Sequence, residues 1–436
     1  MTDTASTAAA RASGTASRAR VLIAVLLFGT VVINYLDRSN LSIALPAIAE
    51  ELELSKAQQG LLLSAFGWTY AAMQIPGGWL VDRIRPRVLY PLCLVLWSLA
   101  TLFMGMVGGF VALIVLRLLV GACEAPAYPI NSRVATVWFP ERERGTAIGF
   151  YTSGQFIGLA LLTPVLSWLQ SAVSWHWVFI LTGLVGIVWG AVWYLGYREP
   201  RESRANAAEV ELIRSGGGLV DLVDEQPRRA RITRGDLATV LGRRKLWGIY
   251  LGQFCLTSTL WFFLTWFPTY LVDYRGMDYI KSGFLASLPF VAALVGVLTS
   301  GVVSDFLLRR GASLGLARKA PIIIGLLLST LMVGANFTDS TALVIVFLSV
   351  AFFGNGLASI TWSLVSALAP ERLLGLTGGM FNFIGNLSSI ATPIVIGFLV
   401  TEDSFAPAFG YMTAVTVAGI LSYVLLVGRV ERVAER

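Results

Sequence analysis

The chain has 436 residues, of which 56% are hydrophobic and only 14% charged, and its formal net charge is +7. Its mean hydropathy is +0.72. This composition excludes an ordinary soluble domain and indicates an integral membrane protein, in which the placement of the positive charges matters more than their sum.

Apolar runs of roughly 20 residues recur along the chain, and each is long enough to cross about 30 Å of hydrocarbon as a helix. We predict an all-α integral membrane fold of twelve transmembrane helices in two six-helix bundles. The predicted spans are residues 21–45, 58–80, 88–107, 110–132, 145–168, 175–197, 246–270, 281–304, 319–336, 341–365, 373–400 and 406–428. The predicted domains are an N-terminal tail over 1–20, a first bundle over 21–197, a linker over 198–245, a second bundle over 246–428 and a C-terminal tail over 429–436.

Charged residues between the spans alternate in sign along the chain. Connections marked by Arg83, Arg142 and Arg309 form an arginine-rich side, whereas those marked by Glu50 and Glu402 form an acidic side. By the positive-inside rule the arginine-rich side is cytoplasmic, and both termini and the linker lie there.

Two segments outside the spans allow alternative interpretations. The apolar run that begins at Val21 continues to Pro46, which favours a retained span over a signal peptide, and the Ala-, Ser- and Thr-rich residues before it are typical of a disordered tail. In the linker, the glycines after Ser215 lack the Gly-Lys-Ser/Thr of a phosphate-binding loop. The apolar residues between Ala207 and Leu222 favour short amphipathic helices at the membrane surface.

The two halves of the chain repeat each other. The stretches 140–149 and 370–379 share Pro-Glu-Arg and two glycines at the same spacing, and Gly78–Asp82 matches Gly301–Asp305 in position. These matches indicate a duplicated six-span unit. Glycines four residues apart, which let helices approach closely, occur at Gly145/Gly149 and at Gly154/Gly158.

The first span carries Asp37 and Arg38 side by side in an otherwise apolar run. A charge at bilayer depth costs about 2.5–3.5 kcal/mol on insertion scales, so it is expected to face protein or a water-filled cavity. The fourth span adds Arg117 and Glu124, which lie on nearly the same helix face. Because Asp37 and Arg38 diverge by about 100° around their helix, we predict that Arg38 pairs with Glu124 and Asp37 with Arg117. The alternatives are an arginine that reaches the helix end and a static charge network that stabilises the bundle.

These groups have the chemistry that a proton-coupled anion carrier needs. A guanidinium binds a carboxylate bidentately and keeps its proton throughout. Glu124 lies in an apolar stretch, where burial favours its protonated form and a neighbouring Arg38 favours its ionised form. We therefore predict that Asp37 and Glu124 exchange protons, that Arg38 binds the substrate and that Arg117 belongs to the charge network.

Longer motifs resemble those of a known family. Gly78-Trp79-Leu80-Val81-Asp82-Arg83 is similar to the signature between the second and third spans of the major facilitator superfamily, which usually has glycine where Arg85 stands. Within this superfamily, the chain resembles the anion:cation symporter family over most of its length after the first 20 or so residues. The motifs that carry the resemblance are residues 34–38, 74–79, 124–126, 151–155 and 356–362.

The resemblance implies proton-coupled uptake of a sugar acid by alternating access, with D-galactonate or a related hexonate as substrate. It implies that the substrate contacts are Tyr35, Arg38, Tyr70, Gln155, Ser359, Thr361, Trp362 and Asn382. Interfacial placement, core packing and interhelical hydrogen bonding are the alternatives for the uncharged members of this set. Asp82, Arg83 and Asp305, on the arginine-rich side, are predicted to lock a conformation that is closed on that side.

Other functions compete with this prediction. A glucarate/galactarate-type diacid symporter would want a second cation in the second half, and spans seven, eight, ten and eleven have no Arg or Lys at mid-depth. A drug/proton antiporter would usually lack the Arg38 and Arg117 pair. A non-transporting sensor would need an output domain, and an intramembrane enzyme would need a catalytic or metal-binding set that a chain with a single histidine does not offer.

The remaining expectations concern partners and location. We predict a sugar acid anion, protons and the lipid bilayer as partners, no nucleic acid, no cofactor and no metal. We also predict a monomer that crosses a bacterial inner membrane many times and has both termini in the cytoplasm.

Overall fold

The computed structural model describes residues 15–220, 233–370 and 373–433. Most of the predicted N-terminal tail, Leu222 of the linker and Glu371 and Arg372 of the repeated motif lie outside these residues. Within them every regular element is helical and none is a strand. The all-α prediction is therefore confirmed.

Helices of membrane-spanning length follow the predicted order. Over the described ranges, ten helices are long and apolar enough to cross a bilayer, and Arg244–Thr265 with Phe267–Tyr274, bent by 49°, can serve as an eleventh. The second predicted span is two shorter helices, Lys56–Ala72 and Gln74–Arg83, with Met73 between them. These spans agree with a twelve-helix fold.

The helix bounds fall into three sets. The first half comprises α2 (Ala19–Glu51), α3 (Lys56–Ala72), α4 (Gln74–Arg83), α5 (Pro86–Met104), α6 (Phe110–Glu124), α7 (Ala127–Trp138), α8 (Glu141–Ala172) and α9 (Trp175–Gly196). The connection contains η1 (Pro200–Glu202), α10 (Ala207–Ser215) and α11 (Arg234–Leu241). The second half comprises α12 (Arg244–Thr265), α13 (Phe267–Thr269), η2 (Tyr270–Tyr274), α14 (Tyr279–Arg309), α15 (Leu314–Ser329), η3 (Thr330–Phe337), α16 (Thr341–Leu357), η4 (Ala358–Thr361), α17 (Trp362–Leu368), α18 (Leu374–Asn386), α19 (Ser388–Leu399), α20 (Ala406–Leu421) and η6 (Ser422–Val427).

Several helices are longer than the apolar spans that predict them. The predicted span 21–45 becomes α2, which continues past Pro46 to Glu51, and the predicted span 145–168 becomes α8, which covers Glu141–Ala172. Hydropathy identifies only the part of a helix that is apolar enough for the hydrocarbon core of the bilayer. The backbone hydrogen bonds continue into polar turns on either side.

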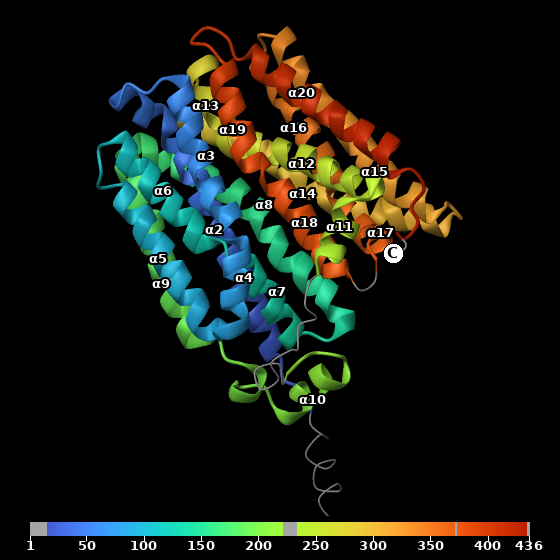
Figure 1. Cartoon of the computed structure of the whole chain (residues 1–436). Helices are drawn as coiled ribbons and strands as arrows, with labels where there is room; N and C mark the ends of the chain where they lie inside the picture. Colours follow the sequence, from blue (N-terminus) through green and yellow to red (C-terminus); the bar gives the residue numbers. More distant parts are fainter. Residues whose placement is uncertain (1–14, 221–232, 371–372, 434–436) are drawn as a thin grey trace, which may run out of the picture.

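The two halves stand side by side, with the first half in blue to green and the second in yellow to red (Figure 1). They meet on the acidic side, where the Lys56 Nζ at the start of α3 lies 2.9 Å from the Asp273 carboxylate of η2. Close by, α3 packs on α19 so tightly that a Cβ at Gly60 would lie 2.6 Å from the Pro393 carbonyl oxygen. Glycine is therefore required at position 60 in this conformation.

The halves do not pack in the same way on the arginine-rich side. A Cβ added at Gly145, Gly149, Gly375 or Gly379 would have no described atom within 4 Å. Gly154 and Gly158, further along α8, lie close to α2 instead. Of the two predicted glycine pairs, only the second supports a close helix contact here.

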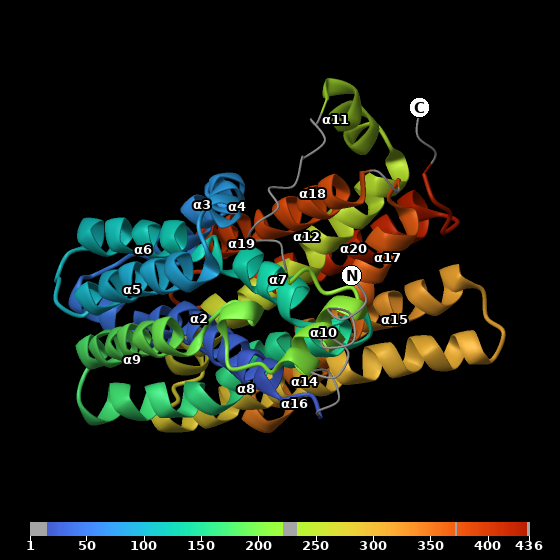
Figure 2. The same cartoon turned by 90° about the horizontal axis from the view of Figure 1, so that it is seen from below.

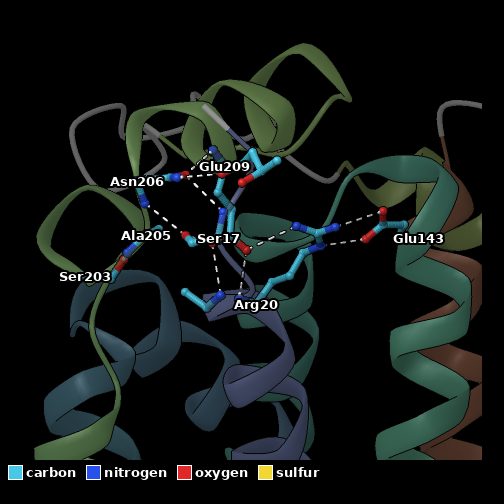
Figure 3. Close-up of polar contacts among 9 residues, drawn as sticks. Ser17, Arg20, Glu143, Ser203, Ala205, Asn206 and Glu209 are labelled. Carbon is cyan, nitrogen blue, oxygen red and sulfur yellow. Dashed lines mark hydrogen bonds and ion pairs between the residues drawn. The ribbon is translucent and has the colours of Figure 1, made fainter. Parts of the chain in front are cut away.

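The first part of the connection is bound to the first half (Figure 3). Glu209 of α10 accepts hydrogen bonds from the backbone N–H groups of Ala19 at 3.0 Å and Arg20 at 3.1 Å, which open α2. Arg20 also donates to Glu143 of α8 at 2.8 Å. A carboxylate at a helix N-terminus satisfies free N–H groups and complements the helix dipole.

The connection thus divides between the two halves. Helix α10 forms in the segment where we predict amphipathic helices, and its Ile213 is buried against the first half. Helix α11 lies beside α12 of the second half, as the view from below shows (Figure 2). The residues that join the two parts, 221–232, are outside the described chain.

Candidate functional site

Arg38 and Glu124 form a buried ion pair between α2 and α6. The Arg38 Nε lies 2.7 Å and its Nη2 2.6 Å from the Glu124 Oε1. Arg38 is 5% exposed and Glu124 0%. The predicted pairing of these two residues is therefore confirmed.

The position of Glu124 follows from a break in its span. Glu124 is the last residue of α6, and α7 begins at Ala127 after Pro126, which has no backbone N–H to continue the helix. Asn34, one turn before Arg38 on α2, donates its amide to the same Glu124 Oε1 at 3.2 Å. The other carboxylate oxygen, Oε2, is buried and has no hydrogen-bond partner among the described residues.

Aromatic rings surround the Arg38 guanidinium. Its Cζ lies 4.9 Å from the ring centres of Tyr35 and Tyr70, 5.0 Å from that of Phe66 and 5.9 Å from that of Trp261. Such contacts between a cation and ring faces are attractive, and more so away from water. The structure therefore brings two predicted substrate residues, Tyr35 and Tyr70, to Arg38.

Two members of this cage are absent from the sequence prediction. Phe66 stands one turn before Tyr70 on α3, so the helical period could have pointed to it. Trp261 comes from α12 of the second half, and nothing in its own segment marks it. Of these four rings, Trp261 is the one whose contact with Arg38 joins the two halves.

The predicted pairing of the Asp37 and Arg117 side chains is wrong. Arg117 donates to the backbone carbonyl oxygens of Asp37 at 2.9 Å and Arg38 at 3.2 Å. The Asp37 carboxylate instead accepts the indole N–H of Trp97, on α5, at 3.0 Å. The physical reason is rotation around α2: Asp37 faces the interior of the first half, where the α5 indole reaches it.

The predicted contacts in the second half form their own pairs. Thr361 donates to the Gln253 amide oxygen at 3.0 Å, and the Trp362 ring lies 4.9 Å from that of Phe381. Asn382 accepts from Asn386 at 3.2 Å. Gln253 is a polar group of α12 that the sequence prediction lacks.

Two further predicted contacts, Gln155 on α8 and Ser359 on η4, are partly buried. Within the described chain, no hydrogen bond, ion pair or ring contact joins the predicted residues of the second half to Arg38. The structure thus holds a charged cluster in one half and a neutral polar set in the other.

The predicted gating residues lie on the arginine-rich side. Arg83 and Asp82 are at the end of α4, where the Arg83 Cζ stacks 3.9 Å from the ring centre of Trp79. Asp305 is exposed near the end of α14. Their role in a conformation closed on this side stays a prediction.

The site is therefore a buried ion pair surrounded by aromatic rings. Over the described ranges, no three His, Cys, Asp or Glu residues are grouped as metal ligands would be. Removing one partner of a buried ion pair typically costs 3–5 kcal/mol because the other charge is left uncompensated. Arg38 can leave Glu124 only if another anion replaces it, and Glu124 can lose Arg38 only if it takes a proton.

Comparisons with known proteins agree with this architecture. The family description Major Facilitator Superfamily matches residues 27–317. The D-galactonate transporter of Escherichia coli O6:H1 is 54% identical over 95% of this chain and 97% of its own. The "Probable galactarate/D-glucarate transporter GudP" of Bacillus subtilis is 42% identical over 97% of this chain and 94% of its own.

Solved structures agree in fold. An inward-facing, occupied structure of a bacterial homologue of the human lysosomal transporter Spinster has a TM-score of 0.68 at 20% identity and covers 94% of this chain and 95% of its own. The helical architecture, which agrees with a twelve-helix fold, the family match and the extent of these similarities lead to one conclusion: the chain belongs to the major facilitator superfamily of membrane transporters.

Proposed function

We propose that this protein takes up a sugar acid anion together with protons, and that D-galactonate is the leading substrate. The observation that carries the proposal is the buried ion pair between Arg38 and Glu124. The named relative at 54% identity supports the substrate class. We place the protein in a bacterial inner membrane as a monomer, with the arginine-rich side and both termini in the cytoplasm.

In this mechanism the proton and the substrate each bind one partner of the same ion pair. A proton on Glu124 releases Arg38, whose guanidinium then binds the substrate carboxylate bidentately. Because each event favours the other, proton and anion raise each other's affinity by the same factor. Asp37 is the second proton carrier, and Arg117 holds the backbone of α2 beside it.

The hydroxyl groups of the sugar acid need neutral partners. We assign Tyr35, Tyr70 and Gln155 in the first half and Ser359, Thr361, Trp362 and Asn382 in the second to this role. The Trp362 ring, 49% exposed, would cover the C–H face of the sugar. The Tyr35 and Tyr70 rings already face Arg38, which would place them beside a bound carboxylate.

Transport proceeds by rocking of the two bundles, residues 21–197 and 246–428, around the site. The Lys56–Asp273 ion pair and the close approach of Gly60 to Pro393 join the two halves on the acidic side, which supports our assignment of this structure to an inward-facing state. In the opposite state Asp82, Arg83 and Asp305 would close the arginine-rich side. The linker, 198–245, joins the two moving bodies.

A diacid such as galactarate or glucarate is the second candidate, because a relative at 42% identity is named for these substrates. A second carboxylate would favour a second cation in the cavity, and the middle of the second-half spans contains none. The monoacid is therefore preferred. The named relatives are transporters, which favours a carrier over an enzyme or a sensor.

Counterflow in proteoliposomes tests the proposal. Vesicles loaded with one unlabelled aldonate or aldarate take up labelled D-galactonate, and the series is repeated across a panel of both classes. We expect exchange with hexonates and at least about tenfold less with diacids. Exchange that is fastest with galactarate or glucarate would move the substrate assignment to the diacids.

A further inference from the structure

Trp97 and Asn40 hold the Asp37 carboxyl group inside the first half. The Trp97 indole N–H donates to the Asp37 Oδ2 at 3.0 Å, and the Asn40 amide makes a longer contact of 3.5 Å to its Oδ1. All three residues are 0% exposed. We infer that Trp97 and Asn40 are positioning residues for Asp37, Trp97 for its charged form and Asn40 for both its charged and its protonated form, which rests on the proposed role of Asp37 as a proton carrier.

The two donors differ in what they can do. An indole N–H only donates, so Trp97 stabilises a carboxylate and offers nothing to the hydrogen of a protonated carboxyl group. An asparagine amide has an acceptor as well as donors. Asn40 can therefore serve either form of Asp37, if its amide can turn.

The surroundings of Asn40 allow that turn. Its Nδ2 also donates to the Thr182 hydroxyl of α9 at 3.3 Å, while its Oδ1 is buried without a hydrogen-bond partner among the described residues. Rotating the amide by 180° would place this free acceptor towards Asp37. The Thr182 hydroxyl, which now donates to the Val178 carbonyl at 2.8 Å, can turn to donate to Asn40 instead.

Charged groups act on Asp37 from nearby without touching its carboxyl oxygens. Glu124 and Arg117 lie on α6, and Arg38 is the residue next to Asp37 on α2. The Arg117 guanidinium donates hydrogen bonds to backbone carbonyls, and the Arg38 guanidinium forms an ion pair with Glu124. The direct partners from α2 and α5 are thus neutral donors, and changing them alters the local support of Asp37 without removing a charge.

The test compares two buried tryptophans in the same bundle. Trp97→Phe removes the donor to Asp37. Trp193→Phe is the matched control, because Trp193 is also 0% exposed and its indole donates at 3.2 Å to the Pro86 carbonyl, away from Asp37. The full-length variants are reconstituted, and proton-driven uptake of D-galactonate is measured from pH 5 to 9.

We expect Trp97→Phe to move the pH profile upward by about one unit, since a lost hydrogen bond to a charged group weakens the ionised form. Trp193→Phe should leave the profile unchanged, and both should keep proton-independent counterflow. Asn40→Leu should slow proton-driven uptake by about tenfold, and Asn40→Ser, whose hydroxyl both donates and accepts, should restore part of it. If Asn40→Leu does not fold, the comparison of Trp97→Phe with Trp193→Phe and the behaviour of Asn40→Ser test the inference.

A pH profile of Trp97→Phe that coincides with that of Trp193→Phe would overturn the inference. The Asp37→Asn variant separates this result from failure of the proposed function. If Asp37→Asn keeps the proton stoichiometry of the parent, Asp37 carries no proton and both proposals lose this residue. If Asp37→Asn loses a proton from the cycle while Trp97→Phe keeps the parent profile, only the positioning role fails.

Discussion

The two halves of this duplicated chain have the same helical plan but different chemistry in their centres. The first half places Asp37, Arg38, Arg117 and Glu124 within α2 and α6, all buried. The second half has neutral polar groups at its centre, such as the Thr361 hydroxyl, which donates a hydrogen bond to Gln253. This difference supports the proposed division of roles, in which one copy carries the charged groups and the other contacts the hydroxyl groups of the substrate.

Trp261 connects the two kinds of chemistry. It belongs to the neutral half but lies 5.9 Å from the Arg38 Cζ, and its ring centre is 5.9 Å from that of Phe66. In the proposed rocking motion, movement of the second half would therefore change how Trp261 covers the Arg38 guanidinium.

Arg38→Lys should weaken D-galactonate binding by about 30-fold or more, although the positive charge remains. A lysine is a point charge without the bidentate fork, and a lost charged hydrogen bond of about 2 kcal/mol corresponds to that factor. Calorimetry on the purified protein measures it. Arg198→Lys is the control, because Arg198 lies just after α9 and donates to the backbone carbonyls of Tyr194 and Tyr197. Binding within threefold of the parent would remove Arg38 from direct contact.

An inside-negative membrane potential should raise substrate accumulation by the parent more than tenfold above the level that the pH gradient alone supports. Two protons entering with one monoanion carry net positive charge, and 100 mV then contributes about 2.3 kcal/mol. Asp37→Asn should make the cycle electrically neutral. Potassium/valinomycin-clamped vesicles without a pH gradient measure both. If uptake by the parent ignores an inside-negative potential, one carboxylate keeps a constant protonation state, and we would assign that state to Asp37.

Changes in the neutral half should be milder. Gln253→Leu removes the acceptor that orients the Thr361 hydroxyl, a proposed substrate contact. Losing one neutral hydrogen bond from Thr361 to the substrate, about 1 kcal/mol, should weaken binding by about fivefold. The pH dependence of this variant should equal that of the parent, because no charged group is touched. A shifted pH profile in Gln253→Leu would break the proposed division between the halves.

The contact between the halves on the acidic side should matter least. Lys56→Met removes a partly exposed ion pair with Asp273, which is worth about 0.2–1 kcal/mol. The closed population on the acidic side should fall about two- to threefold, as measured by single-molecule distances between labels at Glu53 and Asp403. Lys245→Met, whose partner Glu431 lies within the second half, is the control and should cause no shift.

The fold could be predicted because hydrophobic length and charge placement are local properties of the sequence. Each apolar run predicted helical structure. The differences lie at helix ends such as that of α2, where polar turns continue the backbone hydrogen bonds to Glu51, and at breaks within spans such as that at Met73. The break after Glu124 was less visible, because an Ala-Pro pair inside an apolar run does not say whether a helix kinks or ends.

The candidate site was only partly predictable. Helical spacing was enough to predict the pairing of Arg38 with Glu124, because their helix faces can meet and their charges are opposite. It failed for Arg117, because a guanidinium can satisfy its donors on backbone carbonyls, which every segment has and no sequence pattern marks. Trp97 and Trp261 were missed because their contacts depend on how separate helices rotate and pack, and an apolar-looking tryptophan is common in any span.

In the proposed mechanism, Glu124 exchanges its ion pair with Arg38 for a proton, and coupling depends on this exchange. Glu124→Gln mimics the protonated carboxyl group and should keep D-galactonate binding and counterflow within about twofold of the parent. It should lose accumulation driven by a pH gradient, because the residue can no longer release a proton. Both activities are measured in the same proteoliposomes. Loss of accumulation with counterflow retained is the predicted result, and uphill uptake at the parent level would contradict the central role of the ion pair.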